Sequence, residues 1–140
     1  MKTIVVSAVS IVLVSILFCP MAMSAPSMPD DLQVVQPDPS LPKELSAFFG
    51  KWEGNDSYAE YIYVVEKIDN EKAKLYFYRS RPLESAGAGW FRYEGNVIKE
   101  GKKYKLLYRG VTGPIELTLK GENSLNVSSP VWSLRFRRVQ

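Results

Sequence analysis

The chain has 140 residues, of which 46% are hydrophobic and 24% charged, and its 18 Lys and Arg exceed its 15 Asp and Glu by three. This length suits one small domain, and so small a positive excess gives no indication of a nucleic-acid partner. The sequence contains no histidine and one cysteine, Cys19, which removes the commonest general base, the commonest metal ligand and any internal disulfide.

Residues 1–25 have the pattern of a secretory signal peptide. Lys2 precedes a run of apolar and small residues over positions 4–18, and small side chains follow at positions 22, 24 and 25. The apolar run is shorter than the ~20 residues that a membrane-spanning helix needs. We therefore expect an exported protein, periplasmic or secreted, without a transmembrane segment in its mature chain.

The cleavage point follows from the small residues that signal peptidase requires. Cleavage after Ser24 fits best and cleavage after Ala25 is the alternative. Phe18 is larger than the residue that normally precedes a lipid-modified cysteine, so lipid anchoring at Cys19 is not expected. Removal of Lys2 with the signal peptide leaves 17 basic residues against 15 acidic ones, a net charge of +2.

Residues 26–43 contain five prolines. Proline removes a backbone donor and restricts the residue before it, so this segment is predicted to be an extended, partly disordered tether. Val34 and Val35 could dock on the domain that follows. A role of the tether in binding a partner is a further alternative.

Residues 44–140 form the predicted folded domain. Residues 44–49 predict one helical turn that Gly50 ends. Short runs rich in aromatic and β-branched residues then alternate with turn residues. The predicted strands cover residues 51–55, 60–68, 73–79, 89–93, 96–99, 103–109, 115–120, 124–127 and 131–138, with one of the turns at 94–96.

The alternation of apolar and polar residues defines the fold class. In residues 115–120, for example, Ile115, Leu117 and Leu119 face one way and the polar residues between them face the other. One buried and one wet face is typical of an antiparallel sheet. We expect an all-β domain, a small closed up-and-down barrel of about eight strands, with a β-sandwich as the second interpretation because its crossings need longer connections.

The segment around Gly50 and Trp52 resembles the Gly-x-Trp signature with which lipocalins begin their first strand. The chain is also similar to a group of small secreted bacterial barrels of lipocalin type, on the strength of the Gly89–Trp90 pair and the terminal Arg138–Val139. The resemblance implies that Trp52 closes one end of the barrel and that an arginine from the last strand packs across it. Arg138 is the first candidate for that arginine and Arg137 the second.

The predicted interior is rich in aromatic residues. Side chains can just fill an eight-stranded barrel, or such a barrel can hold one small ligand, so a packed core and a small apolar pocket both remain open. The candidate pocket residues are Tyr63, Phe77, Trp90, Tyr104, Tyr108 and Trp132. Arg79 and Arg81 flank the longest loop, 79–88, and could bind a carboxylate or phosphate head group; an ordinary solvated loop is the alternative.

Two classes of function follow from this pattern. The first is a non-catalytic module that binds a small apolar or amphipathic molecule in the barrel, and the second is a module that binds an envelope or host protein through its outer surface or tether. Catalysis, a metal and a cofactor are not expected, because the usual nucleophile–base pairs and metal-ligand clusters are absent from the sequence. A pair of carboxylates, Glu53 with Glu60 or Glu66, is the remaining catalytic alternative.

Overall fold

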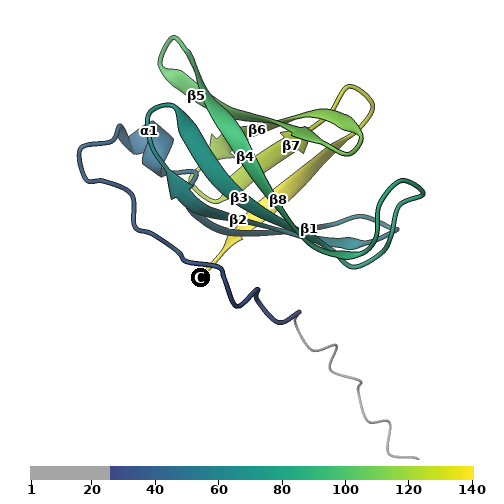
Figure 1. Ribbon diagram of the computed structural model, residues 1–140. Helices are drawn as coiled ribbons and strands as arrows, with labels where there is room; N and C mark the ends of the chain where they lie inside the picture. Colours follow the sequence, from purple (N-terminus) through teal and green to yellow (C-terminus); the bar gives the residue numbers. More distant parts are fainter. Residues whose placement is uncertain (1–25) are drawn as a thin grey trace, which may run out of the picture.

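The computed structural model describes residues 26–140, so the predicted signal peptide, both cleavage points and Cys19 lie outside the described residues. Figure 1 shows a barrel with a short helix at one end and an extended N-terminal segment beside it. The elements are α1 (Lys43–Ser46), β1 (Gly50–Asn55), β2 (Glu60–Ile68), β3 (Lys72–Arg79), β4 (Gly89–Glu100), β5 (Lys103–Gly110), β6 (Gly113–Gly121), β7 (Ser124–Ser128) and β8 (Ser133–Val139). No helix in this part of the chain is long and apolar enough to cross a membrane.

The strands of residues 26–140 form one closed antiparallel barrel in the order β1 to β8. Each strand pairs with the next along the chain, and β1 closes the barrel on β8 through the pairs Lys51–Val139, Trp52–Arg138 and Glu53–Arg137. Closure leaves no sheet edge unpaired. The predicted up-and-down barrel of about eight strands is confirmed, and the sandwich alternative is wrong.

The strand boundaries agree with the prediction to within two residues except in β4. Residues 89–93 and 96–99 were expected to be two strands around a turn, but they belong to one strand of 12 residues. Gly95 is buried inside that strand, where an added Cβ would lie 3.4 Å from the Leu107 carbonyl oxygen and 3.5 Å from Leu75. The glycine therefore permits close packing inside the barrel and does not mark a turn.

One end of the barrel is closed by the helix and the residues before β1. Leu41, Leu45 and Phe48 are buried together with Trp52 in the main core. The Trp52 indole Nε1 donates a hydrogen bond of 2.9 Å to the Phe48 carbonyl oxygen, which ties the first strand to the segment that covers this end.

The proline-rich segment runs extended along the outer face of β2, β3 and β4. The Val35 amide donates to the Glu66 carbonyl oxygen at 2.9 Å, and the Gln33 amide donates to the Glu66 carboxylate at 2.8 Å. At its start, the Trp90 indole donates to the Ser27 carbonyl oxygen at 2.9 Å. The predicted extension is present, but the segment lies packed on the barrel and does not stand free as a tether.

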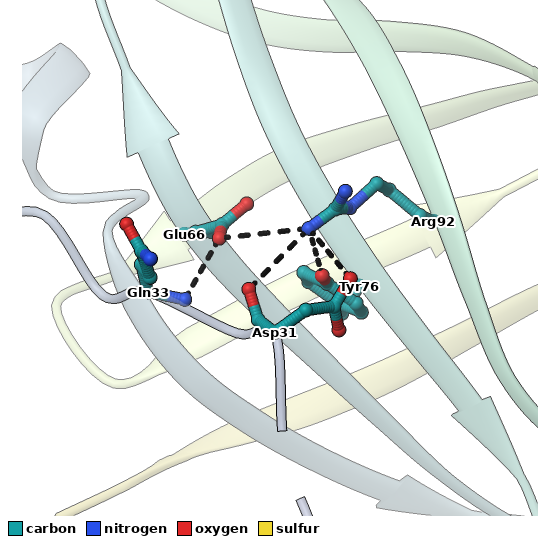
Figure 2. Close-up of polar contacts among 5 residues, drawn as sticks. All are labelled: Asp31, Gln33, Glu66, Tyr76 and Arg92. Atoms are coloured by element: carbon teal, nitrogen blue, oxygen red, sulfur yellow. Dashed lines mark hydrogen bonds and ion pairs between the residues drawn. The ribbon is translucent and has the colours of Figure 1, made fainter. Parts of the chain in front are cut away.

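Arg92 of β4 joins this segment to the barrel (Figure 2). Its Nη2 atom lies 3.1 Å from the Asp31 carboxylate and 4.0 Å from that of Glu66, and it donates to the Tyr76 hydroxyl. The Glu66 side chain is only 7% exposed, and a buried carboxylate needs compensation. Arg92 and the Gln33 amide provide it.

Candidate ligand-binding site

The barrel contains a cavity of about 440 Å³. The connections β1–β2, β3–β4, β5–β6 and β7–β8 all contribute to its wall, so it lies at the end opposite α1. Its volume is within the ~300–1,000 Å³ typical of small-molecule sites. The lining residues are Asp56, Tyr58, Tyr61, Tyr63, Phe77, Arg79, Leu83, Tyr93, Tyr108, Gly110, Val111, Thr112, Ile115, Trp132, Ser133, Leu134 and Phe136.

An aromatic cluster forms the inner part of the cavity wall. The ring centres of Tyr63 and Phe77 are 4.7 Å apart, those of Tyr63 and Phe136 are 5.1 Å apart, and those of Tyr93 and Tyr108 are 4.6 Å apart. These separations are typical of interacting aromatic pairs. The wall is therefore mainly apolar and packed in defined positions.

Two hydroxyls lie together in this apolar wall. The Tyr63 and Tyr108 oxygens are 2.5 Å apart, and burial raises the pKa of both tyrosines above the ordinary value. Both phenols therefore keep their protons at neutral pH. Since one proton suffices to bond the pair, the second is free to be donated to a ligand or a water molecule.

Asp56 and Arg79 are the charged residues among those described that line the cavity. The Asp56 carboxylate accepts hydrogen bonds from the Tyr58 and Ala59 amides at 2.8 Å and from the Tyr61 hydroxyl at 3.1 Å. Burial raises the pKa of Asp56, but these hydrogen bonds outweigh that effect and the pKa lies below its ordinary value. Burial and the bond to Asp56 raise the pKa of Tyr61 to about 12.

Arg79 is buried at the end of β3, with 4% of its surface exposed. Its Nε donates to the Gly87 carbonyl oxygen at 2.7 Å, and its guanidinium carbon lies 4.8 Å from the centre of the Phe91 ring. Its Nη2 atom is buried and has no hydrogen-bond partner within residues 26–140.

The structure brings five of the eight predicted pocket residues to the cavity: Tyr63, Phe77, Tyr108, Trp132 and Arg79. Trp90 was predicted to face inward and this is wrong. It pairs with Tyr78 in the register of β3 and β4 and packs on the outer face with Tyr76 and Tyr78. Its neighbour Phe91 faces inward beside Arg79, so the prediction was one residue out of register.

Tyr104 and Arg81 do not line the cavity either. Tyr104 packs against the core from the first half of β5, nearer the closed end, and Lys99 lies 5.7 Å from its ring centre. Arg81 is exposed in the β3–β4 loop and lies over the Tyr58 ring at 5.7 Å. Of the two arginines proposed for an anionic head group, only Arg79 reaches the cavity.

Several lining residues were not predicted as site residues. Tyr93 was assigned to a strand end beside a supposed turn, and its inward position depends on the continuous β4. Asp56, Tyr58, Leu83 and Val111 lie in loops, where strand alternation carries no information. Tyr61 was not predicted as a site residue either, although it lies two residues before Tyr63 in β2 and therefore on the same face of that strand.

The carboxylates of the catalytic alternative do not line the cavity. Glu53 pairs with Lys51 at 2.7 Å, Glu66 lies under the N-terminal segment, and Glu60 is exposed. No group of three or more His, Cys, Asp or Glu side chains that could hold a metal occurs within residues 26–140.

The rim of the cavity is apolar and exposed. Each of the four loops at this end carries a large hydrophobic side chain in contact with solvent: Tyr58, Leu83, Val111 and the pair Val131 and Trp132. Val131 is 82% exposed, so it contributes nothing to the core. Exposed apolar residues gathered around one opening indicate a surface that meets an apolar molecule or partner.

Comparison with known proteins yielded no match to a family model, a curated protein or a solved structure. The function of the chain must therefore follow from the chemistry of the cavity and its rim.

Proposed function

We propose that this chain is an exported, non-catalytic module of lipocalin type that binds a small apolar or amphipathic molecule inside its barrel. The observation that carries the proposal is the cavity of about 440 Å³ among aromatic and aliphatic side chains. A barrel of eight strands can be filled by its own side chains, so retention of such a space favours a ligand over a purely structural core.

The two ends of the barrel support the same function. Leu45, Phe48 and Trp52 are buried at the closed end, whereas the other end is surrounded by exposed apolar side chains such as Leu83 and Val131. An apolar rim lowers the cost of passing an apolar molecule from its source into the barrel. The free proton of the Tyr63–Tyr108 pair offers one polar contact that would orient the ligand.

The first test measures binding of a simple amphipathic probe. Dodecanol, titrated into the purified exported protein, should change the fluorescence of Trp132, which lines the cavity, and native mass spectrometry should show one probe bound per chain. The Trp132→Phe variant should still bind the probe but lose most of the fluorescence change, since Trp52 lies at the closed end and Trp90 on the outer face.

A cavity-filling variant tests the location of the ligand. Leu134→Trp adds bulk to the cavity wall and should weaken dodecanol binding at least tenfold, whereas Val34→Trp, at a 50% exposed position on the outer segment, should leave it unchanged. Equal binding by both variants would contradict a ligand inside the barrel.

The mass of the exported product also tests the expected cleavage after Ser24 or Ala25.

The exposed rim favours a second function, the binding of an envelope or host protein at this end of the barrel. Val131 and Trp132 are 82% and 38% exposed, and tryptophan is among the residues enriched at protein interfaces. The variant Val131→Asp leaves the cavity wall intact because Val131 does not line it. If the protein acts through a partner, the Val131→Asp variant should no longer recover that partner in a pull-down. The same variant should still bind dodecanol.

A further inference from the structure

Arg79 is a buried cation for which the described chain provides no anion. Its side chain lines the cavity, is 4% exposed and leaves Nη2 without a hydrogen-bond partner within residues 26–140. We propose that the barrel ligand carries an anionic oxygen head group, a carboxylate or a phosphate, which binds Arg79 while its apolar part occupies the aromatic cavity. This inference rests on the proposed function and specifies its ligand class.

The energetic cost of this arrangement supports the proposal. A buried charge is expensive unless it is paired and fully hydrogen-bonded. A guanidinium carries five N–H donors and no acceptor, so the buried Nη2 of Arg79 needs an acceptor oxygen. An anionic ligand would supply the missing charge and the missing acceptor together, and a guanidinium matches the geometry of a carboxylate or phosphate.

The neighbouring groups do not compensate Arg79. The ion pairs found among residues 26–140 involve Lys51, Lys72, Arg92 and Lys105 as cations. Asp56, the acidic residue of the cavity wall, already accepts three hydrogen bonds from Tyr58, Ala59 and Tyr61. The Phe91 ring at 4.8 Å offers a cation–π contact, which is weaker than an ion pair in such a buried place.

The loop after β3 holds the Arg79 guanidinium near the mouth of the cavity. The Arg79 Nε is bonded to the Gly87 carbonyl oxygen at 2.7 Å, and Gly87 lies in the exposed loop of residues 80–88, where an added Cβ would meet no atom within 4 Å. The head group then lies at the end of β3, near the mouth, with the Tyr63–Tyr108 wall deeper in the barrel.

A series of probes with one chain and different head groups tests the proposal. Dissociation constants of laurate, dodecyl phosphate, dodecanol and dodecyltrimethylammonium are measured by calorimetry on the exported protein at neutral pH. At least one anion should bind about tenfold or more tightly than dodecanol, since a hydrogen bond to a charged group is worth at least that factor, and the cation should bind most weakly. The ratio of laurate to dodecyl phosphate affinity distinguishes a carboxylate from a phosphate ligand.

Variants at two arginines assign the preference. Arg79→Met should reduce the affinity for the anions to that for dodecanol, Arg79→Lys should give an intermediate loss, and Arg81→Met, outside the cavity, should leave all affinities unchanged. If Arg79→Met does not fold, the wild-type series and Arg79→Lys decide the question.

The failures of the two proposals are distinguishable. Equal binding of laurate, dodecyl phosphate and dodecanol by the wild-type protein, or an anion preference that persists in Arg79→Met, overturns the role of Arg79 and leaves the binding function standing. Absence of binding by every probe overturns the binding function itself and the inference with it.

Discussion

The guanidinium carbon of Arg138 lies 4.1 Å from the centre of the Trp52 ring. The same guanidinium donates to the carbonyl oxygens of Ala47 at 2.5 Å and Phe49 at 2.7 Å, just after α1, and its Nε donates to that of Glu122 at 3.0 Å. Arg138 of the last strand thus covers Trp52 of the first strand. It also binds the backbone after α1 and between β6 and β7. This is the packing predicted from the Gly-x-Trp signature and the terminal arginine.

The first prediction concerns Trp52, which is fully buried. Trp52→Ala should reduce the free energy of unfolding by ~3–5 kcal/mol, because it removes the largest side chain of the closed end and leaves a cavity there. That is a large part of the ~5–15 kcal/mol expected for a domain. Urea unfolding followed by circular dichroism measures the change, and a loss below ~1 kcal/mol would show that Trp52 does not support this end.

The second prediction separates Arg138 from its neighbour Arg137. Arg138→Met should reduce the free energy of unfolding by about 2–3 kcal/mol, because the carbonyl oxygens of Ala47, Phe49 and Glu122 lose their charged donor. Arg137 is exposed, so Arg137→Met should change stability by less than ~0.5 kcal/mol. Equal losses in the two variants would contradict the assignment of Arg138 as the covering residue.

Strand alternation predicted the barrel and much of its interior, because closure of an antiparallel sheet leaves one face of every strand inside. It placed Tyr63, Phe77 and Tyr108 on the cavity wall correctly. It was wrong at Trp90, which packs on the outer face with Tyr76 and Tyr78. A shift of one residue moves a side chain to the opposite face, so Trp90 was assigned inside and Phe91 was overlooked.

The outer position of Trp90 has a tertiary cause. The Pro-rich segment covers the outer face of β2 to β4, so apolar side chains such as Val64 and Tyr76 are buried there too. Both faces of these strands are therefore apolar, and alternation no longer tells which face is inside. Of the loop residues in the cavity wall, Trp132 was predicted as part of an expected strand over residues 131–138. The others were missed, because their positions depend on how the barrel closes.

The third prediction tests the docked N-terminal segment. Leu32 packs against the outer cluster that contains Val64 and Tyr76, whereas Val34 is 50% exposed. Leu32→Asp should release the segment, reduce the free energy of unfolding by ~1–2 kcal/mol and make residues 26–40 susceptible to limited proteolysis. Val34→Asp should leave both properties unchanged, and equal susceptibility of the two variants would mean that docking does not depend on Leu32.

The fourth prediction concerns alkaline pH. Burial raises the pKa of Tyr63 and Tyr108 above the ordinary value of 10.0, so the folded state keeps protons that the unfolded chain loses. Their contribution to stability is complete below about pH 10 and is lost as the pH rises further towards the folded-state pKa values. In this range each buried tyrosine should lower the free energy of unfolding by up to ~1.4 kcal/mol per pH unit.

The double variant Tyr63→Phe, Tyr108→Phe isolates this effect from the titration of lysines. It removes both partners of the hydroxyl pair and preserves their shape, so its stability at neutral pH should be close to that of the wild-type protein. Between about pH 10 and about pH 11 its free energy of unfolding, measured by urea titration, should fall less steeply than that of the wild-type protein. Identical slopes would mean that these two phenols ionise in the folded barrel, and hence that the inner wall of the cavity is open to water.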